Sequence, residues 1–444
     1  MYKKFKYISL NPPLFLTLGF GIMILIGGIL LNLPFVSKSG ESVGFINALF
    51  TASSASCVTG LVVVNTAEYW NIAGQLIILF LIQIGGLGIM TLATLFPIIM
   101  SKKIGLTSRQ IIREQLNVET MSGMVKLLKY VIYFTLTVEL IGAVLMSSVF
   151  IPRYGVNTGI WYSIFHSISA FCNAGFDVLG TSIVPFKNNI IINIAIMLLI
   201  IIGGLGFQVT AELYQKKSIK NLHVHSKIVL LMSFILIVGG ALGFLLLERS
   251  NGATIGNETT FNKVLQSLFQ SVVARTAGFN SVDLSKIRES SVVLLIMLMF
   301  IGGSPGSTAG GLKTTTFGVL FISMISTIRG EQKAVVFKKT IPTGIILKSL
   351  AIVMISISLV ILISFALTIS EEFVFIDIFY EVVSAYATVG VSRGITPFLS
   401  DIGKIIITIT MYIGRIGPLT MAYAFGKKKR TSKIEYPDES ISVG

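Results

Sequence analysis

The chain has 444 residues, of which 53% are hydrophobic and only 12% are charged, and its mean hydropathy is +0.84. Soluble domains carry about 25% charged residues, so this composition excludes an ordinary soluble protein and indicates an integral membrane protein. Several apolar runs are long enough to cross a hydrocarbon core of about 30 Å, and the first is too long for a cleaved signal peptide. These runs include residues 14–33, 190–211 and 348–369.

The net charge of +15 is distributed in a way that favours a membrane topology and argues against a nucleic-acid partner. Basic clusters alternate along the chain with acidic connections, and Lys and Arg concentrate in cytoplasmic loops of membrane proteins. We therefore expect a multi-pass protein of the cell membrane, surrounded by the lipid bilayer, with both termini in the cytoplasm. The basic clusters fall within residues 3–6, 102–113, 216–227, 329–339 and 427–430.

A glycine preceded by small and apolar residues occurs four times, roughly a quarter of the chain apart, and each is followed by a second glycine cluster in an apolar run. The four are Gly60, Gly175, Gly278 and Gly390. The same internal order found four times indicates a repeat architecture. We divide the chain into repeats at 1–100, 101–215, 216–328 and 329–426, followed by a tail at 427–444.

Each repeat predicts an outer helix, a pore helix too short to span, a filter loop and an inner helix, which makes the chain an all-α polytopic membrane protein. Re-entrant backbone leaves polar groups unpaired, so the four loops must line water or be buried in protein around one common axis. The expected ranges are 14–36, 47–56, 58–60 and 72–100; 126–150, 160–172, 173–176 and 190–213; 227–248, 262–274, 276–279 and 290–327; 345–369, 375–386, 388–391 and 401–425.

The loops have the features of a cation filter made of backbone carbonyls. The Thr388-Val389-Gly390 sequence resembles potassium-channel filters, in which carbonyl oxygens replace the hydration shell of the ion. The inward C-terminal ends of the pore helices favour a cation, and glycine permits the backbone angles that carbonyls facing one axis require. With one glycine per loop, we expect a shorter filter with looser discrimination. The candidate ion-binding residues are Val58, Thr59, Gly60, Asn173, Ala174, Gly175, Thr276, Ala277, Gly278, Thr388, Val389 and Gly390.

The third inner helix is interrupted by a glycine-rich stretch with a proline, which cannot continue a helix. Polar backbone at that depth is tolerated beside a cavity, so we predict a movable gate under the filter. The stretch is close to a phosphate loop, but an extra leucine precedes its lysine and no strand comes before it, so we reject nucleotide binding. The gate residues are Gly302, Gly303, Ser304, Pro305, Gly306, Ser307, Thr308, Ala309, Gly310, Gly311, Leu312 and Lys313.

Arg415 interrupts the fourth inner helix and completes the predicted gate. An arginine within the membrane is costly and usually functional. Two roles are compatible with its position: an electrostatic barrier that faces the pore, and a hydrogen-bond donor to the carbonyls of the 302–313 loop. We favour both roles together over a purely structural pairing.

Four other ionisable residues fall within expected membrane segments: Glu139, His166, Arg275 and Glu381. Residues behind a filter commonly support it through hydrogen bonds, and this structural role is favoured for all four. The alternative is a coupled proton pathway through Glu139 or His166.

Four non-identical loops with one glycine each, a broken third inner helix and an arginine in the fourth resemble the Trk/Ktr/HKT potassium-transporter superfamily. Residues 275–280 and 413–420 are most similar to the Ktr membrane subunit of the KtrB type. This resemblance implies a pseudo-fourfold pore within each subunit and a membrane homodimer. It also implies a separate cytosolic ring of RCK domains that binds nucleotides and drives the gate.

Within that family, glycine at all four filter positions accompanies potassium selectivity, so the resemblance implies potassium uptake. Family members are often stimulated by sodium, which these residues do not decide. We expect a transporter rather than an enzyme, with K⁺ as the transported ion and no organic cofactor in this chain. The alternatives are a proton- or sodium-coupled alternating-access symporter, which should show inverted repeats, and a non-transporting membrane scaffold.

Overall fold

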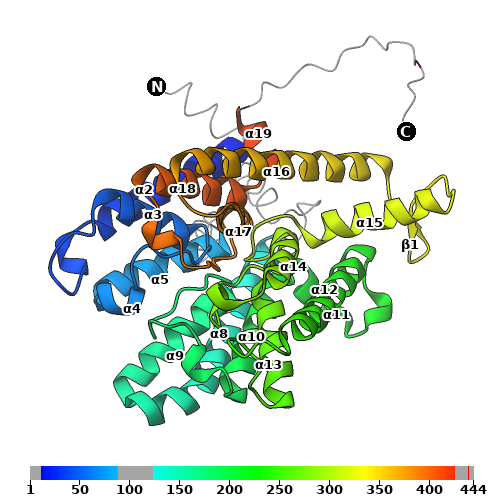
Figure 1. Ribbon diagram of the computed structural model, residues 1–444. Helices are drawn as coiled ribbons and strands as arrows, with labels where there is room; N and C mark the ends of the chain where they lie inside the picture. Colours follow the sequence, from blue (N-terminus) through cyan, green and yellow to red (C-terminus); the bar gives the residue numbers. More distant parts are fainter. Residues whose placement is uncertain (1–11, 89–123, 426–438, 440–444) are drawn as a thin grey trace.

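The computed structural model describes residues 12–88, 124–425 and residue 439, and within them the protein is all-helical apart from one short hairpin (Figure 1). The all-α membrane fold class is therefore confirmed. The second half of the first expected inner helix (89–100) and the tail at 427–438 and 440–444 lie outside the described residues, as do the basic clusters at 3–6, 102–113 and 427–430.

Each repeat contains a long outer helix, a short helix and an inner helix, in the expected order. The outer helices are α2 (Pro12–Leu31), α8 (Met124–Tyr154), α12 (Val224–Glu248) and α16 (Thr343–Ser370). The short helices are α3 (Phe45–Ser56), α9 (Val156–Phe171), α13 (Thr260–Val273) and α17 (Phe375–Tyr386). The inner helices are α5 (Ile72–Leu87), α10 (Ile190–Gly204), α14 (Glu289–Phe300) and α18 (Asp401–Ile416).

Smaller elements connect these helices. Four further helices are α4 (Thr66–Tyr69), α11 (Phe207–Lys216), α15 (Thr314–Ile328) and α19 (Pro418–Phe425). Short 3₁₀ turns are η1 (Pro34–Val36), η2 (Val184–Phe186), η3 (Ile219–Asn221), η4 (Leu284–Lys286) and η5 (Thr396–Phe398). The antiparallel strands β1 (Val335–Val336) and β2 (Lys339–Thr340) pair Val335 with Thr340 and Val336 with Lys339.

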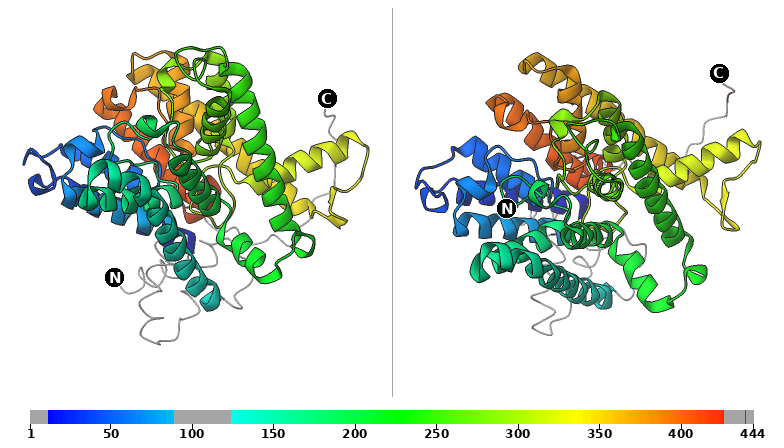
Figure 2. Two further views of the ribbon diagram at one scale, coloured as in Figure 1. Left: turned by 90° about the horizontal axis from the view of Figure 1, so that it is seen from below. Right: turned by 60° about the horizontal axis from the view of Figure 1, so that its bottom comes forward.

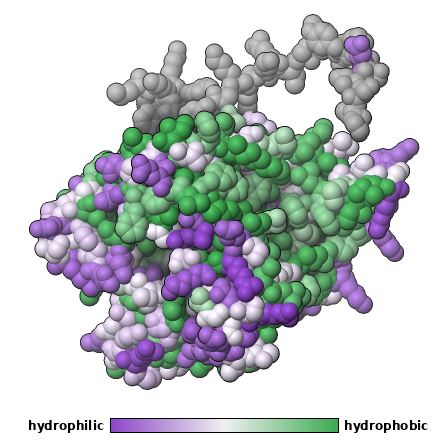
Figure 3. All heavy atoms as spheres, in the orientation of Figure 1, coloured by the Kyte–Doolittle hydropathy of each residue, from purple (hydrophilic) through white to green (hydrophobic). Residues whose placement is uncertain are grey.

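The outer helices are the membrane-crossing elements. Among the described residues four helices are long and apolar enough to cross a membrane, in α2, α8, α12 and α16, and the number rises to six if two bent pairs each count as one span. Large apolar side chains such as Leu140 (65% exposed) and Ile361 (57% exposed) point outward from them. Figure 3 shows the resulting hydrophobic surface over α16, between hydrophilic regions at either end of the view. An exposed apolar surface of this kind fits a lipid surrounding.

Two inner helices that the sequence predicts as continuous are broken, so that prediction was wrong. Helix α10 is followed by α11 at an angle of 97°, and α18 is followed by α19 at 91°. Gly206 (φ +93°) and Gly417 (φ +89°) stand at the breaks, in a backbone conformation that favours glycine. In repeat 3 the break is longer, because residues 301–313 separate α14 from α15 as expected.

The repeats contact one another in a closed ring. Within every repeat the outer helix packs against both the short helix and the inner helix. Between repeats, each inner helix packs against the short helix of the next repeat: α5 against α9, α10 against α13, α14 against α17, and α18 against α3. The last contact returns to the first repeat, and Figure 2 shows the blue, teal, green and orange repeats in that order around the centre.

Glycines allow the inner helices to lie directly on the ends of the short helices. A Cβ at Gly85 would overlap with the carbonyl of Ser56, and one at Gly203 would overlap with that of Phe171. Gly414 has the same relation to the carbonyl of Tyr386 in repeat 4. The glycine clusters of these helices therefore serve close backbone packing.

This packing predicts that Gly414→Ala destabilises the protein by about 1–3 kcal/mol, the usual range for overpacking, because a backbone carbonyl cannot rotate away as a side chain can. Gly239→Ala is the matched control, since a Cβ on Gly239 of α12 meets no atom within 4 Å. Thermal unfolding of the two purified variants in detergent measures the difference. Equal midpoints would contradict the close packing of α18 on α17.

Candidate functional site

Four short loops leave the C-terminal ends of α3, α9, α13 and α17, and each contains one of the glycines singled out by the sequence. Every one of these loop residues is buried, as re-entrant backbone within a membrane requires. We number the loops 1 to 4. They are Val58, Thr59 and Gly60; Asn173, Ala174 and Gly175; Thr276, Ala277 and Gly278; Thr388, Val389 and Gly390.

The four loops converge, and each glycine lies against the backbone of the next loop in the ring. If a Cβ were added to the glycine of one loop, it would contact a carbonyl oxygen of the next loop. That oxygen belongs to the residue directly before the glycine of the next loop. The pairs are Gly60 with Ala174 O (2.5 Å), Gly175 with Ala277 O (2.8 Å), Gly278 with Val389 O (2.8 Å), and Gly390 with Thr59 O. The contacts therefore run from loop 1 to loop 4 and back to loop 1. No side chain fits between these four backbone segments.

The loops share an unusual backbone conformation. The residue two positions before each glycine has a positive φ although it is not glycine: Val58 (58°), Asn173 (62°), Thr276 (81°) and Thr388 (51°). The glycines themselves also have positive φ, while the residues between them do not. Alternation of this kind turns successive carbonyls toward one side. Each such non-glycine residue costs about 1–3 kcal/mol, a strain that clusters at functional sites.

Serines of the short helices support three of the loops. In loops 1 and 4 the N–H of the glycine donates to a serine hydroxyl six residues earlier. In repeat 2 the serine at that position donates to the carbonyl of Phe176, directly after loop 2. The bonds are Gly60 N to Ser54 Oγ (3.1 Å), Gly390 N to Ser384 Oγ (3.1 Å), and Ser169 Oγ to Phe176 O (2.7 Å). These hydrogen bonds fix the loop backbone relative to the helix that precedes it.

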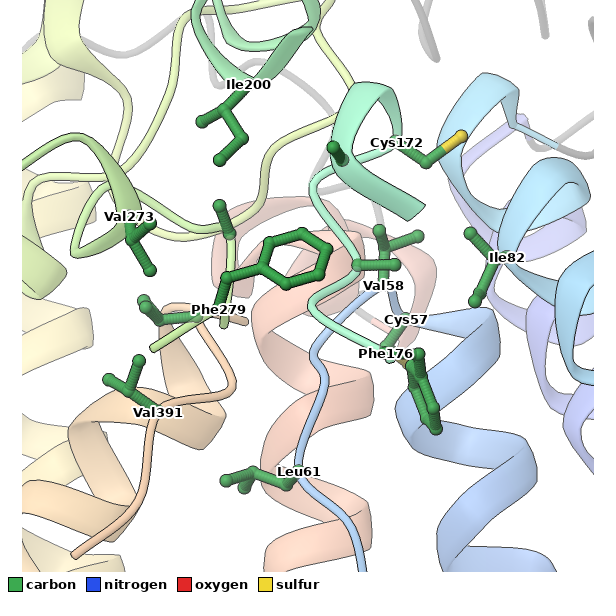
Figure 4. Packing of buried hydrophobic residues seen from close by; sticks show 14 of the residues in the cluster. Cys57, Val58, Leu61, Ile82, Cys172, Phe176, Ile200, Val273, Phe279 and Val391 are labelled. Atoms are coloured by element: carbon green, nitrogen blue, oxygen red, sulfur yellow. The ribbon is translucent and has the colours of Figure 1, made fainter. Parts of the chain in front are cut away.

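Buried apolar residues follow the glycines and separate the loops from the rest of the core. Leu61, Phe176, Phe279 and Val391 come directly after the four glycines and are 0–2% exposed. Figure 4 shows them on four segments of different colour that meet in the centre of the protein. Buried apolar side chains thus lie directly beside each of the four loops.

Residues 301–313, here called the intramembrane segment, are held by the bend in repeat 2. Backbone hydrogen bonds join the segment to the last residues of α10 and the first residue of α11. They run from Ser304 N to Gly204 O (3.0 Å), from Thr308 N to Gly203 O (3.2 Å), and from Phe207 N to Gly306 O (2.9 Å). The unexpected break at Gly206 therefore supplies the backbone groups that fix the intramembrane segment.

The intramembrane segment also touches two of the loops. A Cβ on Gly310 would overlap with the hydroxyl of Thr388, and one on Gly302 would lie 3.1 Å from the Cγ2 of Thr276. The Thr388 hydroxyl is buried and has no hydrogen-bond partner in the described part of the chain. The segment thus covers one end of the ring of loops at contact distance.

Arg415 connects the intramembrane segment to the first repeat. One Nη of its guanidinium donates to the carbonyl of Thr308, and the other donates to the carbonyls of Gly85 and Gly86 (3.2 Å to Gly86). Of the two roles that the sequence left open, the hydrogen bond to a carbonyl of the segment is present. A charged donor shared by three carbonyls makes strong hydrogen bonds.

A cavity of about 620 Å³ lies on the other side of the intramembrane segment. Gly311 lines this cavity and also lies against Ala387, which directly precedes loop 4. Arg415 and Lys313 line it as well, and the Lys313 ammonium donates to Ala309 O (2.8 Å). The intramembrane segment therefore contacts the loops through Gly302 and Gly310 and borders the cavity through other residues, such as Gly311 and Lys313.

The four remaining ionisable residues all make hydrogen bonds, although not to one another. The partners of these bonds lie outside the intramembrane segment, and the structural role predicted for the four stays a prediction. Gln83 Nε2 donates to Glu139 (3.1 Å), His166 Nδ1 pairs with Tyr162 O (2.7 Å), Arg275 donates to Ser233 Oγ (3.2 Å), and Thr396 donates to Glu381.

Residues 23–435 match the family described as TrkH, cation transport protein. The chain belongs to this family. It is similar over its whole length to the potassium/sodium uptake protein NtpJ of Enterococcus hirae, with 44% identity over 441 residues and 98% of each chain covered. It is also similar to the Ktr system potassium uptake protein B of Bacillus subtilis, with 42% identity over 442 residues, 100% of this chain and 99% of that protein.

The fold agrees with this family. The crystal structure of the potassium transporter TrkH from Vibrio parahaemolyticus superimposes with a TM-score of 0.73 at 19% identity, covering 92% of this chain and 83% of that one. Membership and the apolar spanning helices make the chain a multi-pass membrane protein of a cation transport family, which is not a class of enzymes. Three relatives, at 37–42% identity, are named as members of a Ktr system.

Two site contacts were missed by the sequence because they join different repeats, through residues far apart in the chain. The amide of Asn173 bonds the hydroxyl of Thr276 at 3.1 Å, which links loop 2 to loop 3. Gln83 of α5 reaches Glu139 of α8, behind loop 2. Only the first contact could have been expected from the sequence, because Asn173 and Thr276 each stand two residues before the glycine of their loop.

Proposed function

We propose that this chain takes up potassium through a channel-like path that passes between loops 1 to 4. The observation that supports it most directly is the closed cycle of glycine–carbonyl contacts, since only four equivalent loops around one axis produce it. The names of the relatives at 44% and 42% identity agree, because both are potassium uptake proteins. In this proposal backbone oxygens of the loops replace the water around the ion.

The chemistry of the loops favours a cation of low charge density. Carbonyl dipoles and the C-terminal ends of α3, α9, α13 and α17 supply negative potential without a carboxylate. Glycine is present in all four loops, which favours potassium over sodium in the proposal. Sodium is the competing ion, and one relative is named for both ions.

The intramembrane segment and Arg415 form the gate of the proposed path. The segment stands between the loops and the 620 Å³ cavity, and it contacts Thr388 on the loop side. Arg415 holds the segment by its bond to Thr308 O and adds a positive charge beside the path. Both effects oppose the passage of a cation while the segment is in place.

The proposal also covers orientation and assembly. We place both termini and the basic hairpin in the cytoplasm, because Lys and Arg favour that side. Lys227 lies 5.7 Å from the ring of Phe337, so the start of α12 and the hairpin share one end of the protein. We propose that two copies pair in the membrane and that a cytosolic RCK-type ring controls the gate, as the resemblance to the KtrB type implies. Relatives that are named for a Ktr system support the presence of partner components.

Potassium uptake by cells that lack their own potassium transporters tests the function. Gly390→Ser should reduce uptake or potassium preference about tenfold or more, since a side chain there overlaps with Thr59 O and adds backbone strain. Gly394→Ser is the matched control, because Gly394 also has positive φ (+101°) but meets no atom within 4 Å. Uptake that is unchanged in both variants, or dependent on an imposed proton gradient, would refute the channel-like path.

Arg415→Gln tests the gate. The neutral side chain loses the charged bonds to Thr308 and Gly85, so the segment should leave its place more often. We expect potassium flux into liposomes to rise about tenfold, the equivalent of one charge-assisted hydrogen bond. Flux at the wild-type level, with equal amounts of folded protein, would remove Arg415 from the gate.

A further inference from the structure

Loop 3 is built differently from the other three loops, starting with the residue three positions before its glycine. That residue is small in the other repeats, where it is Cys57, Cys172 or Ala387. In repeat 3 it is Arg275, which is only 8% exposed. A buried arginine replaces a small residue at one of four equivalent positions, directly behind a proposed filter loop.

The second difference is the missing serine. Six residues before Gly278, where the other repeats have a serine hydroxyl that supports the loop, repeat 3 has Val272. The end of the short helix changes with it: Ala277 N bonds Val273 O four residues earlier, whereas Val389 N bonds Ser384 O five residues earlier. Loop 3 therefore lacks the serine hydrogen bond that the other loops take from their own helix.

Arg275 makes its contacts outside its own helix. Its Nη2 donates to Ser233 Oγ at 3.2 Å and its Nη1 reaches Ser233 O at 3.5 Å, both on the outer helix α12. Its Nε has no hydrogen-bond partner among the residues that the structure describes. The guanidinium also borders a cavity of about 10 Å³ together with Gly204 and Gly303.

Leaving part of an arginine unsatisfied within the membrane is expensive, and such residues are usually retained for function. The place of Arg275 explains the cost. Arg275 directly precedes loop 3 and borders the same small cavity as Gly303 of the intramembrane segment, and its guanidinium donates to Ser233 of α12 rather than to a carboxylate. At the same end of α13 the hydroxyl of Ser271 also bonds the backbone of α12, at Ile237 O (2.7 Å), so Arg275 is the contact to this outer helix that directly adjoins loop 3.

We propose that Arg275 is a positioning residue that replaces the missing serine: by donating to Ser233 it holds loop 3 in place and thereby sets the discrimination between potassium and sodium. This inference rests on the proposed function of the loops as an ion filter. Fixed carbonyls discriminate between ions by the number and field of the oxygens they offer, so a loosened loop 3 lowers preference more than it lowers rate.

The test converts loop 3 to the design of loops 1 and 2. Uptake of potassium and of sodium is measured in cells without their own potassium transporters, as the ratio of the two half-saturating concentrations. Arg275→Cys should lower the preference for potassium about tenfold, the equivalent of one charge-assisted hydrogen bond. Adding Val272→Ser to Arg275→Cys should restore most of it, because serine and cysteine then stand as Ser54 and Cys57 do in loop 1.

Two further variants separate positioning from general damage. Ser233→Ala should lower the preference in the same direction, and combining it with Arg275→Cys should add nothing further, because both remove one interaction. Arg288→Cys is the matched control, since Arg288 donates to Ser250 (3.0 Å) in an exposed connection away from the loops. It should keep the wild-type ratio.

Wild-type preference in Arg275→Cys, or failure of Val272→Ser to restore it, would overturn the positioning role. Should Arg275→Cys not accumulate in the membrane, the Ser233→Ala ratio decides the question alone, with an unchanged ratio refuting the proposal. A wild-type protein that takes up no potassium would instead refute the proposed function, and this inference with it.

Discussion

The close approach of four stretches of backbone at Gly60, Gly175, Gly278 and Gly390 is the constraint on which the rest of the structure depends. Each glycine lies where a Cβ would strike a carbonyl of the next loop, so the ring closes only if all four positions lack a side chain. The surrounding elements follow from it. The short helices end at the loops, and serine hydroxyls bond the backbone at three of them. Glycines on the inner helices allow those helices to pack directly against the ends of the short helices.

The repeats are alike in the four loops of the ring and unlike in the elements that pack next to it. Repeat 3 breaks its inner helix over thirteen residues, and this intramembrane segment rests on the bend of repeat 2 at Gly206. Repeat 4 contributes Arg415, which binds the segment and reaches the first repeat. Loop 3 has no serine at the supporting position of its short helix, and Arg275 directly before it donates to Ser233 of α12. In this chain four similar loops thus stand beside a segment of repeat 3 that is held by contacts from repeats 2 and 4.

The sequence predicted the parts of the fold that have a local signal. The repeat of the glycine-tipped loops located all four short helices to within a few residues, and glycines with Pro305 located the break in repeat 3. The bends at Gly206 and Gly417 were missed, because a glycine in an apolar helical pattern is usually tolerated. The bond between Asn173 and Thr276 was missed because it depends on which loops are neighbours, and spacing along the chain does not give that order.

The central claim is that one ion path runs between the carbonyls of Thr59, Ala174, Ala277 and Val389. An experimental structure of the full-length protein with thallium in place of potassium tests it most directly, since thallium is located by its anomalous scattering. The account predicts thallium on the axis between the four loops, with backbone oxygens of all four as its ligands. Thallium found at acidic side chains such as Glu139, with none between the loops, would contradict it.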